Sequence, residues 1–246
     1  TDKFFFNGFY MWGKGIVDII PKIKSQDKDN RKKMPKGTKI PGVPSNSSDK
    51  KYIDEASKYV NKTFKNNYGT TDDFMFPISH KTANNWLKNF IDKKFKSFGD
   101  YQDYINTEND FMFHSLLSTS INIGLINPTE IIDKIRKIKG IPMNSYEGYI
   151  RQLFWREYQR YCYKYFNFDS KNYFGNSKKL NKKWYAGETG IDPIDDCIIK
   201  AFETGYLHHI ERLMVMGNFM NLSQISPKEG FKWFMEFSCD SYEWVM

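Results

Sequence analysis

The spacing of the apolar residues from position 79 to 237 constrains the fold more than any other feature of this sequence. They recur every three or four positions in one segment after another, and no convincing stretch alternates apolar with polar residues. Ser79 is a favourable N-cap, and Asn127-Pro128 supplies a second helix start with proline at the first helical position. We therefore predict an all-α domain of about seven helices over residues 76–246, with short connections and no sheet.

The same spacing places the individual helices. The first follows Ser79 and should be broken by Gly99, after which a second begins at residue 101. Further helices are expected over residues 111–124, from residue 128, and over residues 145–166, 192–203 and 227–237. Residues 203–219 continue the pattern and should form a largely buried helix.

Residues 1–75 differ from the rest and are predicted to be an interdomain linker region with partial helices. Six aromatic residues precede an apolar run that ends at Pro21, and so much apolar surface needs a partner to pack on. Residues 25–51 are rich in Ser, Asp, Lys, Gly and Pro and show no periodicity. Weak helical spacing returns over residues 50–64.

The charge distribution favours a phosphate-bearing partner. The chain carries a net charge of +8, and residues 131–183 hold 13 basic against 4 acidic groups, whereas residues 184–246 hold 4 against 10. A basic segment of this kind suits a surface that meets nucleic acid. The alternative is an ordinary solvated face in a lysine-rich chain.

Several classes of protein are disfavoured. No apolar run approaches membrane-spanning length and the N-terminus has no signal-peptide pattern, so we expect a soluble intracellular protein without a membrane partner. The three cysteines form no CxxC pair, and they suit free thiols in a reducing compartment. Neither GxGxxG, GxxxxGK[ST] nor GxSxG occurs, so these nucleotide-binding and hydrolase motifs are excluded.

Residues 203–219 contain the most suggestive polar groups. His209 and Arg212 are three positions apart, which on a helix brings an imidazole and a fixed cation onto neighbouring parts of one surface. His208 and His209 are adjacent and point about 100° apart on a helix, so they cannot readily share a metal ion. The alternative is that both histidines are hydrogen-bonded core residues.

Two other segments carry groups that suit a nucleotide. His114, Ser115 and Ser118 offer small hydrogen-bonding groups beside a helix start, where they could hold a pyrophosphate. Serines in a helix more often bond back to the preceding turn, so that alternative stays open.

The second segment is residues 146–158. Gln152 and Trp155 are three apart, with Arg151 and Arg156 beside them, a set that could stack a base and hold its phosphates. The alternative places Trp155 in the core and both arginines on the surface.

Several spaced motifs resemble one known family. FGDYQDY (residues 98–104), HSLLSTSINIGLINP (114–128), EGYIRQLFWREY (147–158) and ETGYLHHIERLMVMGNF (203–219) resemble the FAD-binding domain of the cryptochrome/photolyase family. The likeness is strongest to the deoxyribodipyrimidine photolyase-related branch, the bacterial (6-4) photolyases that carry an iron–sulfur cluster. DNRKKMP (29–35) resembles the interdomain linker of that branch.

The resemblance implies an all-helical domain that holds a U-shaped FAD. It further implies that DNA carrying an ultraviolet lesion, most of all a (6-4) photoproduct, is bound with the lesion base flipped out beside the flavin. Light-excited reduced flavin then gives an electron to the lesion.

The resemblance also assigns roles to individual residues. Contacts with the FAD fall to Tyr101, His114, Ser115, Leu117 and Ser118 at the phosphates, to Arg212 and Asp240 at the isoalloxazine, and to Gln152 and Asn218 elsewhere in the cavity. His209 matches the histidine that (6-4) photolyases use as a proton donor, with His208 beside it. Trp155 takes the lesion-side position, flanked by Arg151 and Arg156 as DNA contacts, and Trp233 and Trp184 match aromatic residues that pass electrons to the flavin.

The sequence departs from the family pattern in ways that change the expectations. Pro193 stands at the position of the first iron–sulfur cysteine, so we expect no cluster and no other metal. The α/β antenna domain and the segments beyond residue 246 are not in this sequence. We therefore keep three alternatives to a working photolyase: a cryptochrome-like photoreceptor, one part of a split protein that needs a companion polypeptide, and an inactive fragment that only binds DNA.

Overall fold

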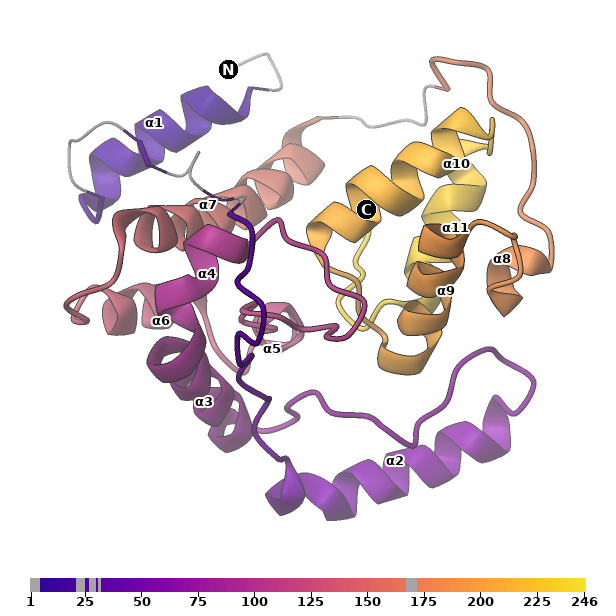
Figure 1. Cartoon of the computed structure of the whole chain (residues 1–246), viewed down its shortest axis with the longest axis horizontal. Coiled ribbons are helices and arrows are strands. Elements are labelled where there is room, and N and C mark those ends of the chain that lie inside the picture. The colour runs from indigo at the N-terminus through magenta and orange to yellow at the C-terminus, as the bar shows by residue number, and fades with distance from the viewer. Residues whose placement is uncertain (1–4, 21–24, 27–29, 31, 167–171) are drawn as a thin grey trace.

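A computed structural model describes residues 5–20, 25–26, 30, 32–166 and 172–246. Every named element among these residues is a helix, and their one extended pairing is an isolated bridge between Lys178 and Ile225. The prediction of an all-α fold is therefore confirmed. Figure 1 shows two groups of helices, one around the long helix α7 and one formed by α8 to α11.

The first group takes in residues up to 165. It comprises α1 (Phe6–Val17), α3 (His80–Asn89), η2 (Phe90–Lys94), α4 (Phe95–Tyr101), α5 (Ser118–Asn122), α6 (Pro128–Ile135) and α7 (Met143–Tyr165). The short η1 (Ser47–Asp49) leads into α2 (Lys50–Thr63), which lies apart from α7 and buries none of its residues (Figure 1). The second group comprises α8 (Lys183–Ala186), α9 (Asp192–Thr204), η3 (Glu211–Gly217), α10 (Asn218–Leu222) and α11 (Pro227–Phe237). Both η2 and η3 are π-helical and run directly into the α-helix that follows them.

Two helix starts confirm the predicted caps. The Ser79 hydroxyl accepts the backbone N–H of Thr82, and the Thr82 hydroxyl closes a capping box. The Asn127 side chain does the same with Glu130, and Pro128 stands at the first helical position. Asp49, a buried carboxylate before α2, accepts hydrogen bonds from both hydroxyls at the start of α3, which ties the two helices together.

Gly99 lies inside α4, so the prediction that it breaks the helix is wrong. A Cβ atom at Gly99 would lie 2.3 Å from the backbone nitrogen of Ser145, so the glycine is needed for the close approach of α4 to α7. Ser145 accepts the Gly99 N–H at 2.8 Å and donates to the Lys96 carbonyl at 3.0 Å.

Residues 111–117 do not form the helix predicted over 111–124, which is reduced to α5. The Asn109 carboxamide oxygen accepts the backbone N–H groups of Phe111 and Met112, which offers the chain an alternative to helical bonding. Met112 and Leu116 then adopt left-handed backbone conformations, with φ of 42° and 56°. The segment is therefore a loop, and Phe111 and His114 contact Tyr206 and His208 in the turn between α9 and η3.

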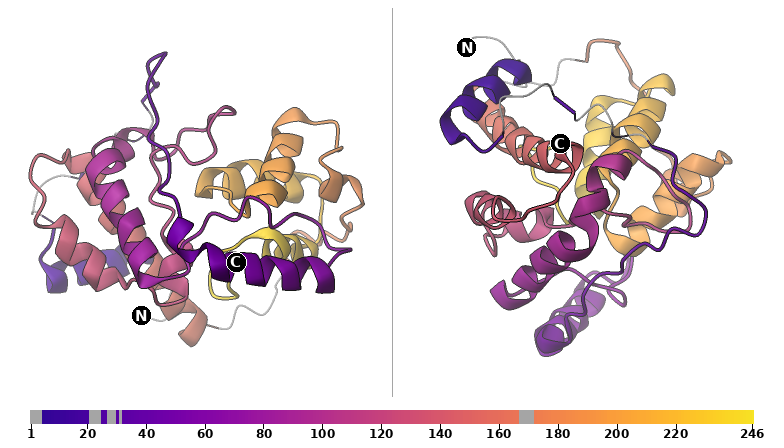
Figure 2. Two further views of the ribbon diagram at one scale, coloured as in Figure 1. Left: turned by 90° about the horizontal axis from the view of Figure 1, so that it is seen from below. Right: turned by 60° about the vertical axis from the view of Figure 1, so that its left-hand side comes forward.

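The aromatic helix α1 packs on α7, as Figure 1 and the right view of Figure 2 show. Phe6 and Tyr10 are buried and belong to the main core with the inner residues of α3, α4, α6 and α7. The boundary at residue 75 stays a prediction, but α1 is part of the packed body.

The second group has its own core. Trp233 is fully buried at its centre and packs on Phe237, with ring centres 4.4 Å apart. Its indole N–H donates to the Trp184 carbonyl at 3.0 Å, which fixes the short helix α8 against α11.

Candidate functional site

Three histidines meet where the first group of helices faces the turn between α9 and η3. The ring centres of His114 and His208 are 4.8 Å apart, and those of His208 and His209 are 5.7 Å apart. Gly205 brings the chain into this turn, because it ends α9 in a left-handed conformation with φ of 65°. A Cβ atom at Gly205 would also collide with Cys239, at 2.4 Å from its sulfur.

The two inner histidines, His114 and His208, are buried and neutral. Burial, together with neighbouring positive charges, lowers the pKa of His114 to about 4 and that of His208 to about 2. His114 Nε2 lies 3.0 Å from the Gln102 carbonyl, but Nδ1 of His114 and Nε2 of His208 find no hydrogen-bond partner among the described residues. Two buried ring nitrogens are thus left available to a ligand.

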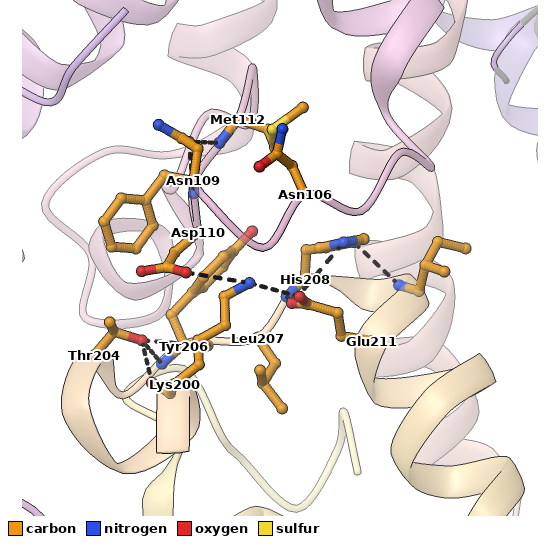
Figure 3. Close-up of polar contacts among 12 residues, drawn as sticks. Asn106, Asn109, Asp110, Met112, Lys200, Thr204, Tyr206, Leu207, His208 and Glu211 are labelled. Carbon is orange, nitrogen blue, oxygen red and sulfur yellow. Dashed lines mark hydrogen bonds and ion pairs between the residues drawn. The ribbon is translucent and has the colours of Figure 1, made fainter. Parts of the chain in front are cut away.

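A buried ion pair next to His208 holds the backbone of that residue in place. Lys200 Nζ lies 2.5 Å from Glu211 Oε1 and 3.5 Å from Asp110, and Glu211 Oε2 accepts the backbone N–H of His208 at 3.1 Å (Figure 3). Burial raises the pKa of Glu211, whereas Lys200 acts in the opposite direction. The pair therefore fixes the backbone of the turn from which the histidines project.

His209 differs from its neighbour because its side chain is 42% exposed. Its Nε2 lies 2.9 Å from Oδ1 of Asp103, a residue just after α4. An accessible imidazole beside a carboxylate has the geometry needed for proton transfer to a neighbouring group.

Arg212 and Asp240 form the second charged pair of the site. Arg212 donates from Nη2 to Asp240 Oδ1 at 2.7 Å and from Nε to the Leu207 carbonyl at 2.6 Å. Burial alone would raise the pKa of Asp240, but Arg212 together with hydrogen bonds from Ser118 and Ser238 holds it below its usual value. The pair joins α5, η3 and the C-terminal segment.

Most of the remaining predicted residues of the 101–118 segment pack within the first group of helices. Tyr101 ends α4 and packs on Phe113, with ring centres 5.4 Å apart. Ser115 makes a hydrogen bond to the buried Tyr149, and Leu117 is buried in the main core. Ser118 makes a hydrogen bond to Asp240, and Asp240 in turn accepts a hydrogen bond from Arg212.

The expected DNA contacts on α7 lie partly under α1. Trp155 stacks on Phe6 with ring centres 3.6 Å apart, and the Arg151 guanidinium lies 5.7 Å from the same ring. Arg156 instead turns toward the site, where it donates to the Asn122 side chain at 3.2 Å and lies over the Trp244 ring. Gln152 is half-buried on the same helix.

The other predicted residues lie in the second group of helices. Trp233 and Trp184 are hydrogen-bonded neighbours in its core, whereas Asn218 is exposed at the start of α10. Pro193 stands in the first turn of α9. The structure thus brings together the three histidines, Arg212, Asp240 and Ser118, and leaves Asn218 on the surface.

Sequence reasoning missed Asp103, Lys200 and Glu211. The only available signal was that Lys200 and Glu211 are charged residues in otherwise apolar helical runs. Asp103 gave no signal, because its partner is 106 positions away.

Other features lie away from the histidines. A hollow of about 270 Å³ near α8 is lined by Lys178, Lys179, Asn181, Lys183, Trp184, Thr189, Ile191, Phe219, Ser223 and Ile225. Among the described residues, no group of three or more His, Cys, Asp or Glu side chains could hold a metal ion. None of the described helices combines the length and apolarity that crossing a bilayer requires.

Comparison with known proteins identifies the family. Residues 149–244 match the model of the FAD binding domain of DNA photolyase, and residues 25–76 match that of deoxyribodipyrimidine photo-lyase-related protein. A (6-4) photolyase of Agrobacterium fabrum is 35% identical over 201 residues, which are 79% of this chain and 40% of that protein. The uncharacterized protein R853 of Acanthamoeba polyphaga mimivirus is 44% identical over 110 residues, 43% of this chain and 85% of that protein.

A solved structure agrees in fold. The crystal structure of a bacterial class III photolyase from Agrobacterium tumefaciens superposes with a TM-score of 0.57 at 19% identity, covering 85% of this chain and 42% of that one. The chain therefore spans about two fifths of the length of its photolyase relatives. These matches, together with the helical fold, show that the chain belongs to the DNA photolyase family, in its photolyase-related branch, and that residues 149–244 resemble the FAD-binding domain.

Proposed function

We propose that this protein is an FAD-dependent, light-driven DNA photolyase that repairs ultraviolet lesions, with the (6-4) photoproduct as its substrate. One observation carries the proposal: residues 207–212 contain both an accessible imidazole and an arginine that is paired with a carboxylate. Arg212 is paired with Asp240 at 2.7 Å, and His209 is half-exposed three positions earlier. The (6-4) photolyase of Agrobacterium fabrum supports this choice of lesion.

The residues around this segment fit a flavin. His114 Nδ1 and His208 Nε2 are buried polar atoms without a partner among the described residues, and a bound cofactor would satisfy them. Arg212 and Asp240 would flank the isoalloxazine, and Tyr101, Ser115, Leu117 and Ser118 would hold the phosphates. When bound and reduced, the flavin supplies the light-driven electron.

The proton step falls to His209. It is accessible and paired with a carboxylate, whereas burial keeps His208 neutral, so His208 orients its neighbour and does not give up a proton. Trp233 and Trp184 would carry electrons from the surface of the second group toward the flavin.

Damaged DNA is the proposed partner, and the exposed basic residues support it. The exposed lysines and arginines of the basic segment are Lys134, Arg136, Lys137, Lys139, Arg160, Lys164, Lys178, Lys179, Lys182 and Lys183. Arg151, Trp155 and Arg156 are the proposed lesion-side contacts, although Phe6 covers Trp155 in this structure. Binding that depends on phosphate contacts should weaken steeply with salt.

A further segment is proposed to complete the domain, either in the same protein or as a companion polypeptide. Leu213, Met214 and Leu222 are 64%, 61% and 71% exposed on η3 and α10. Exposed apolar side chains of this size favour a covering partner. The match to R853 covers 85% of that viral relative. No iron–sulfur cluster is proposed, because Pro193 stands at the first ligand position.

The test is repair of an oligonucleotide with one (6-4) photoproduct by the purified, FAD-supplemented protein under blue light. Repair by the parent chain, lost in His209→Ala with the flavin retained, is the expected result. Flavin photoreduction without repair would favour a photoreceptor, and a folded protein that ignores added FAD would end the proposal. Repair that appears only on co-expression with a companion would show that the domain is completed in trans.

A further inference from the structure

The carboxylate beside His209 belongs to Asp103, a residue to which neither the sequence motifs nor the comparisons assign a role. Asp103 follows the C-terminus of α4, and its side chain is only 9% exposed. A carboxylate so nearly buried needs a partner to offset the lost hydration. His209 Nε2, at 2.9 Å, meets this need.

Hydrogen bonds of the neighbouring residues hold the backbone at Asp103 in place. Its neighbour Gln102 is buried, and the Gln102 carbonyl lies 3.0 Å from His114 Nε2. The backbone N–H of Tyr104 closes the same turn by donating to the Tyr101 carbonyl at 3.1 Å. Hydrogen bonds on both sides therefore hold the backbone that carries Asp103.

The other charges near His209 are already matched. Lys200 is paired with Glu211 and Asp110, and Arg212 is paired with Asp240. His114 and His208 are buried and neutral. Asp103 is thus the carboxylate within hydrogen-bonding distance of His209 in the described part of the chain.

We propose that Asp103 is a positioning residue for the proton step of His209. The inference rests on the proposed function and deepens it. Asp103 accepts the Nε2–H of His209, which fixes the ring orientation and keeps the neutral imidazole in one tautomer. When His209 is protonated on both ring nitrogens, Nδ1 gives its proton to the lesion and leaves the neutral Nε2–H tautomer. Nδ1 then takes a proton back from the product or from water. Asp103 stays ionised throughout, and the Nε2–H never leaves the ring.

The experiment compares Asp103→Asn, Asp103→Glu and His209→Ala in the flavin-loaded protein, with Glu108→Gln as the matched control. Glu108 is an exposed carboxylate five positions further along the same connection. Asp103→Asn should keep the flavin but slow repair by about 10²-fold, the lower end of the usual contribution of a positioned proton donor. Asp103→Glu should recover part of this rate, and Glu108→Gln should repair at the parent rate.

A double variant separates positioning from general damage. Asp103→Asn combined with His209→Ala should be no slower than His209→Ala alone, because residues that act through one group are not additive. Imidazole ¹⁵N spectra provide a readout that does not need activity. The parent should show neutral His209 protonated at Nε2, and Asp103→Asn should show a mixture of both tautomers.

The outcomes are distinguishable from a failure of the proposed function. If His209→Ala repairs normally, or if the parent repairs nothing, the proposed function is wrong, whatever the spectra show. If His209→Ala abolishes repair while Asp103→Asn repairs at the parent rate with an unchanged tautomer, the inference about Asp103 is overturned. If Asp103→Asn loses its fold, Asp103→Glu decides: slowed repair with a changed tautomer balance of His209 supports positioning, and repair at the parent rate with that balance changed contradicts it.

Discussion

Arg212 on η3 donates from Nη2 to Oδ1 of Asp240 at 2.7 Å, although 28 positions separate them in the chain. The Asp240 backbone carbonyl also accepts the Asn122 side chain at 3.1 Å. The ion pair holds the C-terminal segment against η3, and the Asn122 hydrogen bond holds it against α5. The same pair is the proposed contact with the flavin ring, so stability and cofactor binding should depend on it together.

Removing the charge of Asp240 should destabilise the protein. Asp240→Asn leaves Arg212 without its counter-charge in a largely buried position, which should lower the free energy of unfolding by about 3 kcal/mol. Urea denaturation of the variant and of Glu203→Gln measures this. Glu203 is an exposed carboxylate on α9, and its replacement should change stability by less than about 0.5 kcal/mol. Equal stability of the two variants would mean that the Arg212–Asp240 pair is not formed in solution.

Mild acid should destabilise the fold through the buried histidines. The folded-state pKa is about 4 for His114 and about 2 for His208, against 6.5 in the unfolded chain. Between pH 6.5 and 4 the unfolded chain therefore binds more protons, so stability is complete above pH 6.5 and falls as the pH drops. The slope should approach about 1.4 kcal/mol per pH unit for each histidine.

Thermal unfolding at pH 7.5, 6.5 and 5.5 measures that slope. His114→Gln should make it shallower, whereas His80→Gln, which changes an exposed histidine, serves as the control. A melting temperature that stays level from pH 7.5 to 5.5 in the parent would show that the histidines are not buried as described.

Asp49 should stabilise the junction of α2 and α3. It accepts the Thr82 hydroxyl at 2.6 Å and the Ser79 hydroxyl at 2.9 Å, and the Thr82 hydrogen bond is the main reason that its pKa is low. Asp49→Ala should lower the free energy of unfolding by about 1–3 kcal/mol, because both hydroxyls lose their acceptor. Asp54→Ala, which removes an exposed pair with Lys50, should cost less than about 1 kcal/mol. Indistinguishable denaturation midpoints would contradict this account of Asp49.

Trp233 should contribute to stability and to electron transfer separately. Trp233→Ala empties the centre of the second core and should cost about 3–5 kcal/mol. Trp233→Phe keeps most of the volume, so the protein should fold and retain flavin, but photoreduction of the flavin should slow. Trp12→Phe, at a 63% exposed position on α1, is the control. Photoreduction at the parent rate in Trp233→Phe would remove Trp233 from the proposed electron path.

The parts of the fold that depend on neighbours in the sequence could be predicted. Ser79 with Thr82 and Asn127 with Glu130 make their capping bonds across three residues, so the sequence alone reveals them. The apolar spacing likewise located most of α3, α7, α9 and α11.

The parts that depend on distant contacts could not be predicted. Gly99 resembles a helix breaker until the approach of α7 is known, and the loop over residues 111–117 depends on where Asn109 points. The resemblance assigned the proton-donor role to His209, but the sequence could not show that burial separates it from His208. Their difference comes from burial against His114 on one side and from Asp103 on the other, contacts 94 and 106 positions away.

The amount of flavin bound to the purified protein tests the central claim most directly. Residues of α5, η3 and the C-terminal segment are proposed to enclose one FAD, so protein prepared with excess FAD and freed of unbound cofactor should retain it stoichiometrically. Asp240→Asn should retain less, and Glu203→Gln should retain as much as the parent. A correctly folded parent chain that stays colourless after incubation with excess FAD would contradict the account.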